Sequence, residues 1–96
     1  MAAYLVVDTE LTNPARYEDY KQQAKPLAEQ YGGEYLARGG AMTLKETDLW
    51  QPQRLVIIRF PSAEQANRFY DSPEYQKVLQ ISKEAARRSV VILEGL

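Results

Sequence analysis

The order in which strands and helices are predicted along the chain restricts the possible folds more than any other feature of the sequence. Runs of β-branched and apolar residues predict four strands, at 3–9, 34–40, 54–60 and 89–94. Helical spacing of apolar residues fills the gap between the first two strands and the gap between the last two. With right-handed crossovers, this order predicts an α+β fold of the ferredoxin-like split βαβ type, in which helices cover one face of an antiparallel sheet.

Caps and breakers mark the first helix. Asn13-Pro14 combines an N-cap residue with a proline at the first helical position, and apolar residues follow at spacings of three and four. Gly32-Gly33 predicts the end of this helix. Pro26 lies inside it and removes one backbone hydrogen bond, so we expect a kink or a break there.

The second helical region begins at Ser62, whose spacing to Gln65 predicts a capping box. Ser72-Pro73 repeats the combination of cap and proline and restarts a helix. Arg87 and Arg88 come just before the last predicted strand, where positive charge is typical of the C-terminal end of a helix. We therefore expect both arginines to lie at that helix end.

Both faces of the predicted sheet are apolar. In the first strand Leu5 points to one face and Val6 to the other, and the third and fourth strands repeat this pattern. Helices on one side leave the other apolar face bare, which implies a covering partner. We expect a homodimer packed sheet against sheet. The alternative is that the termini or the connection at 41–53 fold across the sheet.

Composition limits the number of domains and the chemistry. The chain has 96 residues, enough for one domain, which we assign to 1–96. Its net charge of −1 leaves no basic excess for neutralising phosphates, so we expect no nucleic acid partner. It contains no histidine and no cysteine, which excludes Ser-His-Asp catalysis, histidine-ligated zinc or haem, disulfides and thiolate sites. We expect neither a cofactor nor a bound metal.

The sequence predicts a cytoplasmic protein. Its first residues lack the basic segment of a signal peptide and reach an aspartate too early for the apolar segment of one. No apolar run approaches the roughly 20 residues that span a bilayer, so we expect no membrane partner.

Arg38 is the first candidate for ligand binding. It ends the second strand just before Gly39-Gly40, and a guanidinium there can hold a carboxylate, an enolate or a phosphate bidentately. The alternative is a salt bridge to Glu34, Glu46 or Asp48, or to the partner subunit. The two glycines predict a bend or bulge with positive φ, because a phosphate-binding loop would need a helix after it.

Four further residues are candidates for a ligand site: Asp8, Tyr17, Trp50 and Tyr75. Asp8 can act as a general base if it is partly desolvated; the alternatives are full solvation or a salt bridge to an arginine such as Arg59. Tyr17 and Tyr75 have the spacing of core residues, with hydroxyls that can reach the rim of a pocket. Trp50 can cover a pocket or pack at the dimer seam, and we favour the seam.

Short motifs that run nearly from end to end carry a family resemblance. They are Asn13-Pro14, Tyr31-Gly32-Gly33, Arg38-Gly39-Gly40, Trp50-x-Pro52, Arg54-Leu55-Val56-Ile57, Phe60-Pro61-Ser62, Ser72-Pro73-Glu74-Tyr75-Gln76, Ala85-Ala86 and Leu93-Glu94-Gly95. In this order they resemble the domain of unknown function 1330 family, a group of small bacterial proteins. The resemblance implies a ferredoxin-like subunit that forms a dimeric α+β barrel, and it implies no established activity.

Two positions depart from the pattern of that family. Its members often carry an arginine at the position of Ser82 and a histidine at the position of Asp71. If those side chains serve a pocket in the relatives, this chain uses a different set. We keep Asp71 among the ligand-binding candidates for that reason.

Three functions are compatible with these observations. We expect a homodimer that binds a small anionic or enolisable molecule near Arg38. The first alternative is a cofactor-independent enzyme, monooxygenase-like or isomerase-like, in which aspartate or tyrosine moves a proton and Arg38 stabilises an oxyanion. The second is a structural or stress-associated dimer without a ligand. RNA binding is disfavoured, because the third strand lacks the aromatic pattern of an RNA-recognition motif.

Overall fold

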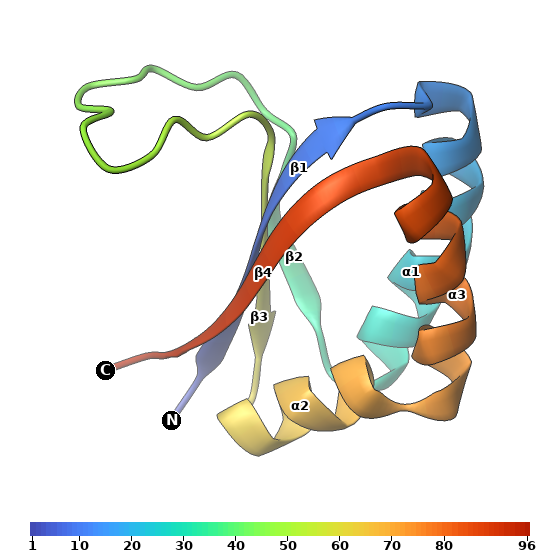
Figure 1. The fold of residues 1–96 in the computed structure, drawn as a ribbon. Helices are drawn as coiled ribbons and strands as arrows, with labels where there is room; N and C mark the ends of the chain where they lie inside the picture. The colour runs from blue at the N-terminus through green and yellow to red at the C-terminus, as the bar shows by residue number, and fades with distance from the viewer.

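The computed structural model describes residues 1–96 and has the predicted order of strands and helices. The elements are β1 (Ala3–Leu11), α1 (Pro14–Gln30), β2 (Glu34–Arg38), β3 (Leu55–Phe60), α2 (Ala63–Asp71), α3 (Pro73–Ala85) and β4 (Ala86–Glu94). The strands pair antiparallel in the order β2-β3-β1-β4, and the three helices lie on one face of the sheet (Figure 1). This confirms the predicted α+β fold of the ferredoxin-like type. No helix is both long and apolar enough to cross a bilayer.

The helices begin at the predicted caps. The side chains of Asn13, Ser62 and Ser72 each accept a hydrogen bond from a backbone N–H in the first turn of α1, α2 and α3. Of the kink or break expected at Pro26, the break is wrong, because α1 continues through that residue. Pro26 and Gln22 both lie on the exposed side, so the carbonyl of Gln22 that loses its intrahelical partner can be hydrated.

The predicted position of Arg87 and Arg88 at a helix end is also wrong. β4 begins at Ala86, three residues before the expected start at 89. β1 extends to Leu11, which lies opposite Ala86, so pairing with β1 holds this segment in an extended conformation. The two arginines therefore point to opposite faces of the sheet: Arg88 toward the helices and Arg87 away from them, where it forms a salt bridge with Glu10 at 3.4 Å.

The face of the sheet beneath the helices, called the inner face below, is arranged in rows that cross the strands. One row, from β2 to β4, consists of Arg38, Val56, Val7 and Val90. In the next row the backbone N–H of Thr9 donates to the carbonyl of Arg54 at 3.0 Å, and Arg88 lies opposite Thr9 on the other side. The inner face thus carries three arginines among aliphatic side chains, and they sit toward the end where β1 leaves the sheet.

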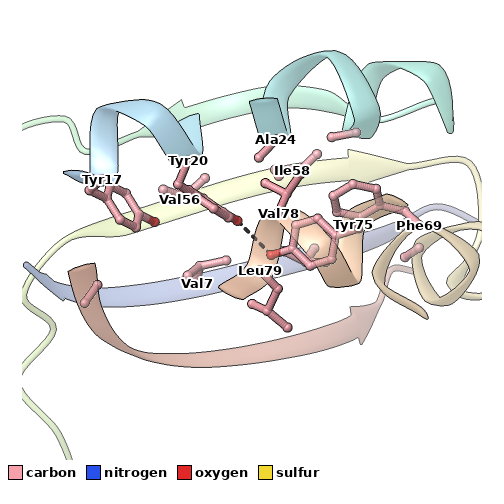
Figure 2. Packing of buried hydrophobic residues seen from close by; sticks show 14 of the residues in the cluster. Val7, Tyr17, Tyr20, Ala24, Val56, Ile58, Phe69, Tyr75, Val78 and Leu79 are labelled. Atoms are coloured by element: carbon pink, nitrogen blue, oxygen red, sulfur yellow. Dashed lines mark hydrogen bonds between the residues drawn. The ribbon is translucent and has the colours of Figure 1, made fainter. Parts of the chain in front are cut away.

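The hydrophobic core lies between the inner face and the helices. Aromatic rings join the layers: Phe60 stacks on Phe69 with ring centroids 5.6 Å apart, and Phe69 packs against Tyr75 at 4.5 Å. Figure 2 shows Tyr20 of α1 and Tyr75 of α3 pointing toward each other inside this core. The buried tyrosines confirm that the helical spacing predicts core positions.

The opposite face of the sheet, called the open face below, has no covering element. Val91 and Leu93 are 56% and 61% exposed there, beside the half-buried Val6 and Ile57. The connection between β2 and β3 projects beyond the end of the sheet, and its residues 41–50 are exposed (Figure 1). The connection therefore does not fold across the open face.

Candidate functional site

A cavity lies between the inner face and the helices α1 and α3. Its free volume is about 30 Å³, which is enough for roughly two ordered waters. Its floor is aliphatic, with Val7 and Val56 at the centre. Its polar lining consists of four tyrosines and four cations: Tyr17, Tyr20, Tyr35, Tyr75, Lys21, Arg38, Arg54 and Arg88. No carboxylate lines the cavity.

Arg88 forms the centre of a hydrogen-bonded cluster in this cavity. Its Nη1 donates to Tyr20 Oη at 2.8 Å and its Nη2 donates to Tyr75 Oη at 3.0 Å. The two phenol oxygens are 2.7 Å apart, so one hydroxyl donates to the other. The guanidinium also lies 5.0 Å from the centroid of the Tyr20 ring. Two phenols from different helices thus occupy the fork of a single guanidinium.

The charges of this cluster are fixed around neutral pH. Burial raises the pKa of Tyr20 above its ordinary value, and the contact with Tyr75 acts in the same direction. Burial alone would lower the pKa of Arg88, but its interactions with Tyr20 and Tyr75 raise it above the ordinary value. The Tyr20 phenol is therefore neutral and the guanidinium is charged. No carboxylate forms a salt bridge with Arg88.

Arg38 and Arg54 lie on the other side of the cavity. The guanidinium carbon of Arg38 is 5.4 Å from the ring centroid of Tyr35, and that of Arg54 is 5.8 Å from the ring centroid of Tyr17. Neither forms a salt bridge, so the expected alternative of an intrachain pair for Arg38 is not observed. Burial raises the pKa of Tyr35 to about 12, so this phenol is neutral too.

Gly39 holds the chain close to Arg54. Its φ is +68°, and a Cβ atom at this position would lie 2.8 Å from Arg54 Nε. The expectation of a positive φ is therefore confirmed for Gly39. It is wrong for Gly40, which has no positive φ and faces open space.

Asp8 lies outside the cavity, on the open side of β1. Its carboxylate accepts hydrogen bonds from Trp50 Nε1 at 2.7 Å and from the backbone N–H groups of Gln53 and Arg54 at 2.8 and 3.1 Å. The expected alternative of a salt bridge to Arg59 is not observed. Burial alone would raise the pKa of Asp8, but the hydrogen bonds from Trp50 and from the two backbone groups lower it below the ordinary value. Asp8 and Trp50 thus anchor the connection between β2 and β3.

The six candidates from the sequence fall into two groups. Arg38, Tyr17 and Tyr75 line the cavity, whereas Asp8, Trp50 and Asp71 do not. Asp71 is exposed at the end of α2. Sequence reasoning did not select Tyr20, Arg54 or Arg88 as site residues. For Arg54 a signal was available. Alternate residues of a strand point to the same face, so Arg54 lies on the same face as Val56 and Ile58, which face the helices.

Ser82 lies next to the cluster. It is only 2% exposed and borders, together with Arg88, a hollow between α3 and β4. The family resemblance implies an arginine at this position.

Comparison with known proteins identifies a family and a fold. The sequence pattern of DUF1330, a domain of unknown function, matches residues 2–96. No protein of curated function matches the chain in sequence.

Three solved structures illustrate the fold. A protein of unknown function from Rhodopseudomonas palustris is 16% identical with a TM-score of 0.78, and the match covers 99% of this chain and 82% of that one. SnoaB from Streptomyces nogalater, a cofactor-independent oxygenase, is 10% identical with a TM-score of 0.71, and the match covers 99% and 93%. A dimeric ferredoxin-like protein of unknown function from Thermobifida fusca is 16% identical with a TM-score of 0.68, covering 99% and 92%. At these identities the likeness extends to the fold alone.

Proposed function

The chain belongs to the DUF1330 family, and we propose that it binds a small organic anion, a carboxylate or an enolate, in the cavity beneath α1 and α3. The observation that carries this proposal is the set of three guanidinium groups, those of Arg38, Arg54 and Arg88, that reach one largely apolar cavity without a carboxylate partner. Residues 1–96 act as a single cytoplasmic domain in this proposal.

Arg88 is the group that we assign to the anion. A half-buried cation without a counter-ion is unfavourable, because its loss of hydration is not offset by an opposite charge. The hydroxyls of Tyr20 and Tyr75 accept from two of its N–H groups but bring no charge. A carboxylate can accept from the guanidinium N–H groups that the tyrosines leave free, or replace the tyrosine oxygens in the fork, and it supplies the missing charge. The aliphatic floor then favours an organic anion over a fully hydrated inorganic one.

A cofactor-independent enzyme is the second candidate. The observation that favours it is the donor set of Tyr20, Tyr75 and Arg88, which resembles the donors that stabilise a developing oxyanion. Proton abstraction also needs a base, however, and no carboxylate or histidine lines the cavity. Binding therefore has more support than catalysis. An acceleration of α-proton exchange of levulinate in deuterated buffer, lost in Tyr20→Phe, would favour the enzyme instead.

We also propose that a second copy of the chain covers the open face, giving a homodimer packed sheet against sheet. The exposed Val91 and Leu93 support this arrangement, as do relatives of this fold that are described as dimeric. Light scattering is expected to give twice the chain mass of 11.0 kDa. Val91→Lys is expected to yield monomers, whereas Leu49→Lys, at a fully exposed residue of the connection, should leave the dimer intact. A monomeric wild type at micromolar concentration would contradict the proposal.

Calorimetric titration with benzoate and hexanoate tests the anion site. We expect the wild type to bind at least one of them and Arg88→Gln to bind it about tenfold more weakly or worse, as for a lost charge-assisted hydrogen bond. Arg68→Gln removes a guanidinium that is 65% exposed on α2 and is expected to bind like the wild type. If neither carboxylate binds to the wild type, the anion site is wrong and the structural dimer without a ligand becomes the better interpretation.

A further inference from the structure

We infer that the cavity selects a dianion, with one anionic group held at Arg88, the other at Arg38 and Arg54, and a short apolar segment between them. This inference rests on the proposed function and names the class of ligand that the same cavity takes. It follows from how the three guanidinium groups are distributed over the sheet.

The three arginines lie on the inner face but come from opposite edges of the sheet. Arg88 lies on the edge strand β4, whereas Arg38 ends the other edge strand, β2, and Arg54 directly precedes the neighbouring strand β3. Arg54 and Arg88 share one row with Thr9 between them. Two strand spacings separate their backbones, which corresponds to roughly 10 Å. Arginines whose backbones lie this far apart favour a ligand with an anionic group for each side over one compact anion.

The second cationic group is a pair rather than a single residue. The close approach of Gly39 to Arg54 Nε brings the chain directly after Arg38 against the Arg54 side chain. Both guanidinium groups lie near aromatic rings, and neither has a carboxylate partner. Lys21 also lines the cavity, but its charge is neutralised by Glu18 at 2.9 Å. The unpaired charge on this side is therefore that of Arg38 and Arg54.

The middle of the cavity sets the nature of the linker. Val7 and Val56 lie in the row that runs from Arg38 toward β4, so the floor between the two cationic groups is aliphatic. A polar linker would lose hydration there without gaining hydrogen bonds. A chain of a few methylene groups or a single ring matches the aliphatic floor, and the side chains that line the cavity must move to admit it, because the free space holds only about two waters.

Arg38 marks the opening of the cavity. It also lines a polar surface groove along α1 that contains Lys25 and Glu29, whereas Arg88 lies deeper, under Tyr20 and Tyr75. The group at the exposed Arg38 would therefore remain partly hydrated. Two anionic groups would leave one net positive charge on the three arginines, which is compatible with tight but reversible binding.

Calorimetric titration with chain-length-matched acids tests the inference. The dicarboxylates succinate, glutarate and adipate are compared with butyrate, valerate and hexanoate. We expect the best dicarboxylate to bind the wild type at least about tenfold more tightly than its matched monocarboxylate. Arg38→Gln and Arg54→Gln should each reduce this preference toward parity with little change for the monocarboxylates. Arg88→Gln should weaken both classes, and Arg68→Gln should weaken neither.

The outcomes separate this inference from the proposed function. Binding of monocarboxylates that depends on Arg88, without any preference for dicarboxylates, would overturn the dianion and leave the anion site standing. A preference that survives in Arg38→Gln and Arg54→Gln would overturn it as well. Absence of binding by every acid would overturn the anion site itself. Arg38 is exposed, so its variant is expected to fold, and circular dichroism of each variant checks this point.

Discussion

Tyr20 on α1 and Tyr75 on α3 meet inside the core with their hydroxyl oxygens 2.7 Å apart, and both oxygens accept hydrogen bonds from the guanidinium of Arg88 on β4. Two helices and one edge strand are thereby joined at a single charged group. The same contact fixes the orientation of Arg88 toward the cavity. The contribution of this contact to stability and its role in ligand binding can be measured separately.

Tyr75→Phe removes one of the two oxygens that satisfy Arg88. We expect the free energy of unfolding to fall by about 1–3 kcal/mol, because a half-buried charged donor loses its acceptor while the packing of the buried ring is kept. Urea unfolding followed by circular dichroism measures the change. Tyr31→Phe is the matched control, since Tyr31 is half-buried against Phe69 and its hydroxyl has no hydrogen bond within the chain. Equal loss in both variants would contradict a special role for the cluster.

Thr9 carries the one buried side-chain oxygen without a hydrogen-bond partner. Thr9→Val keeps the shape of the side chain and removes that hydroxyl, so we expect stability to be unchanged or to rise by up to about 1 kcal/mol. Thermal unfolding measures the change, with Thr43→Val in the exposed connection as the control. A loss of more than about 1 kcal/mol would mean that the hydroxyl has a partner, such as an ordered water.

The anchor between Asp8 and the connection should depend on pH. The pKa of Asp8 in the folded chain lies below the ordinary value of 3.8, so the carboxylate stabilises the fold above that pH. This contribution is lost as the pH falls through the lowered pKa. We expect Asp8→Asn to be less stable than the wild type at pH 7 and the difference to shrink at about pH 2.5. Thermal unfolding at both values measures it.

The fluorescence of Trp50 gives an independent measure of the contact between Asp8 and the connection. It is the only tryptophan of the chain, and its indole N–H donates to Asp8. We therefore expect the fluorescence emission to change when Asp8→Asn releases the connection at pH 7. Asp71→Asn removes an exposed carboxylate at the end of α2 and should leave the emission unchanged. Identical emission in all three proteins would show that the hydrogen bond does not hold the connection.

Much of the fold could be predicted because the determining interactions are local. Alternating apolar residues and helical spacing identify the strands and helices, and Asn13, Ser62 and Ser72 cap the helices as expected. The start of β4 could not be predicted in this way. Pairing with the far end of β1 decides it, and no feature of the sequence around Arg87 and Arg88 signals that pairing.

Part of the site could be predicted, because local patterns placed some of its residues in the correct strand or helix. Arg38 and Tyr75 are brought to the cavity by the strand and the helix in which they were placed. Asp8 was expected to serve a ligand, but its partners Trp50 and Gln53 lie more than 40 positions away in a connection without regular structure. Arg88 escaped selection because a wrong element was assigned to it. The register of the sheet, rather than any motif, assembles the three arginines.

Gly39 tests the packing that brings Arg54 beside the residue following Arg38. Gly39→Ala places a Cβ atom on a backbone with φ of +68° and 2.8 Å from Arg54 Nε, so both the backbone and the guanidinium must move. We expect a loss of about 1–2 kcal/mol in the free energy of unfolding, together with weaker binding of dicarboxylates. Gly40→Ala is the matched control, because Gly40 has no positive φ and a Cβ atom there meets open space. Chemical denaturation and calorimetric titration measure the two effects. If the two alanine variants behave alike, the contact between Gly39 and Arg54 does not position the second cationic group.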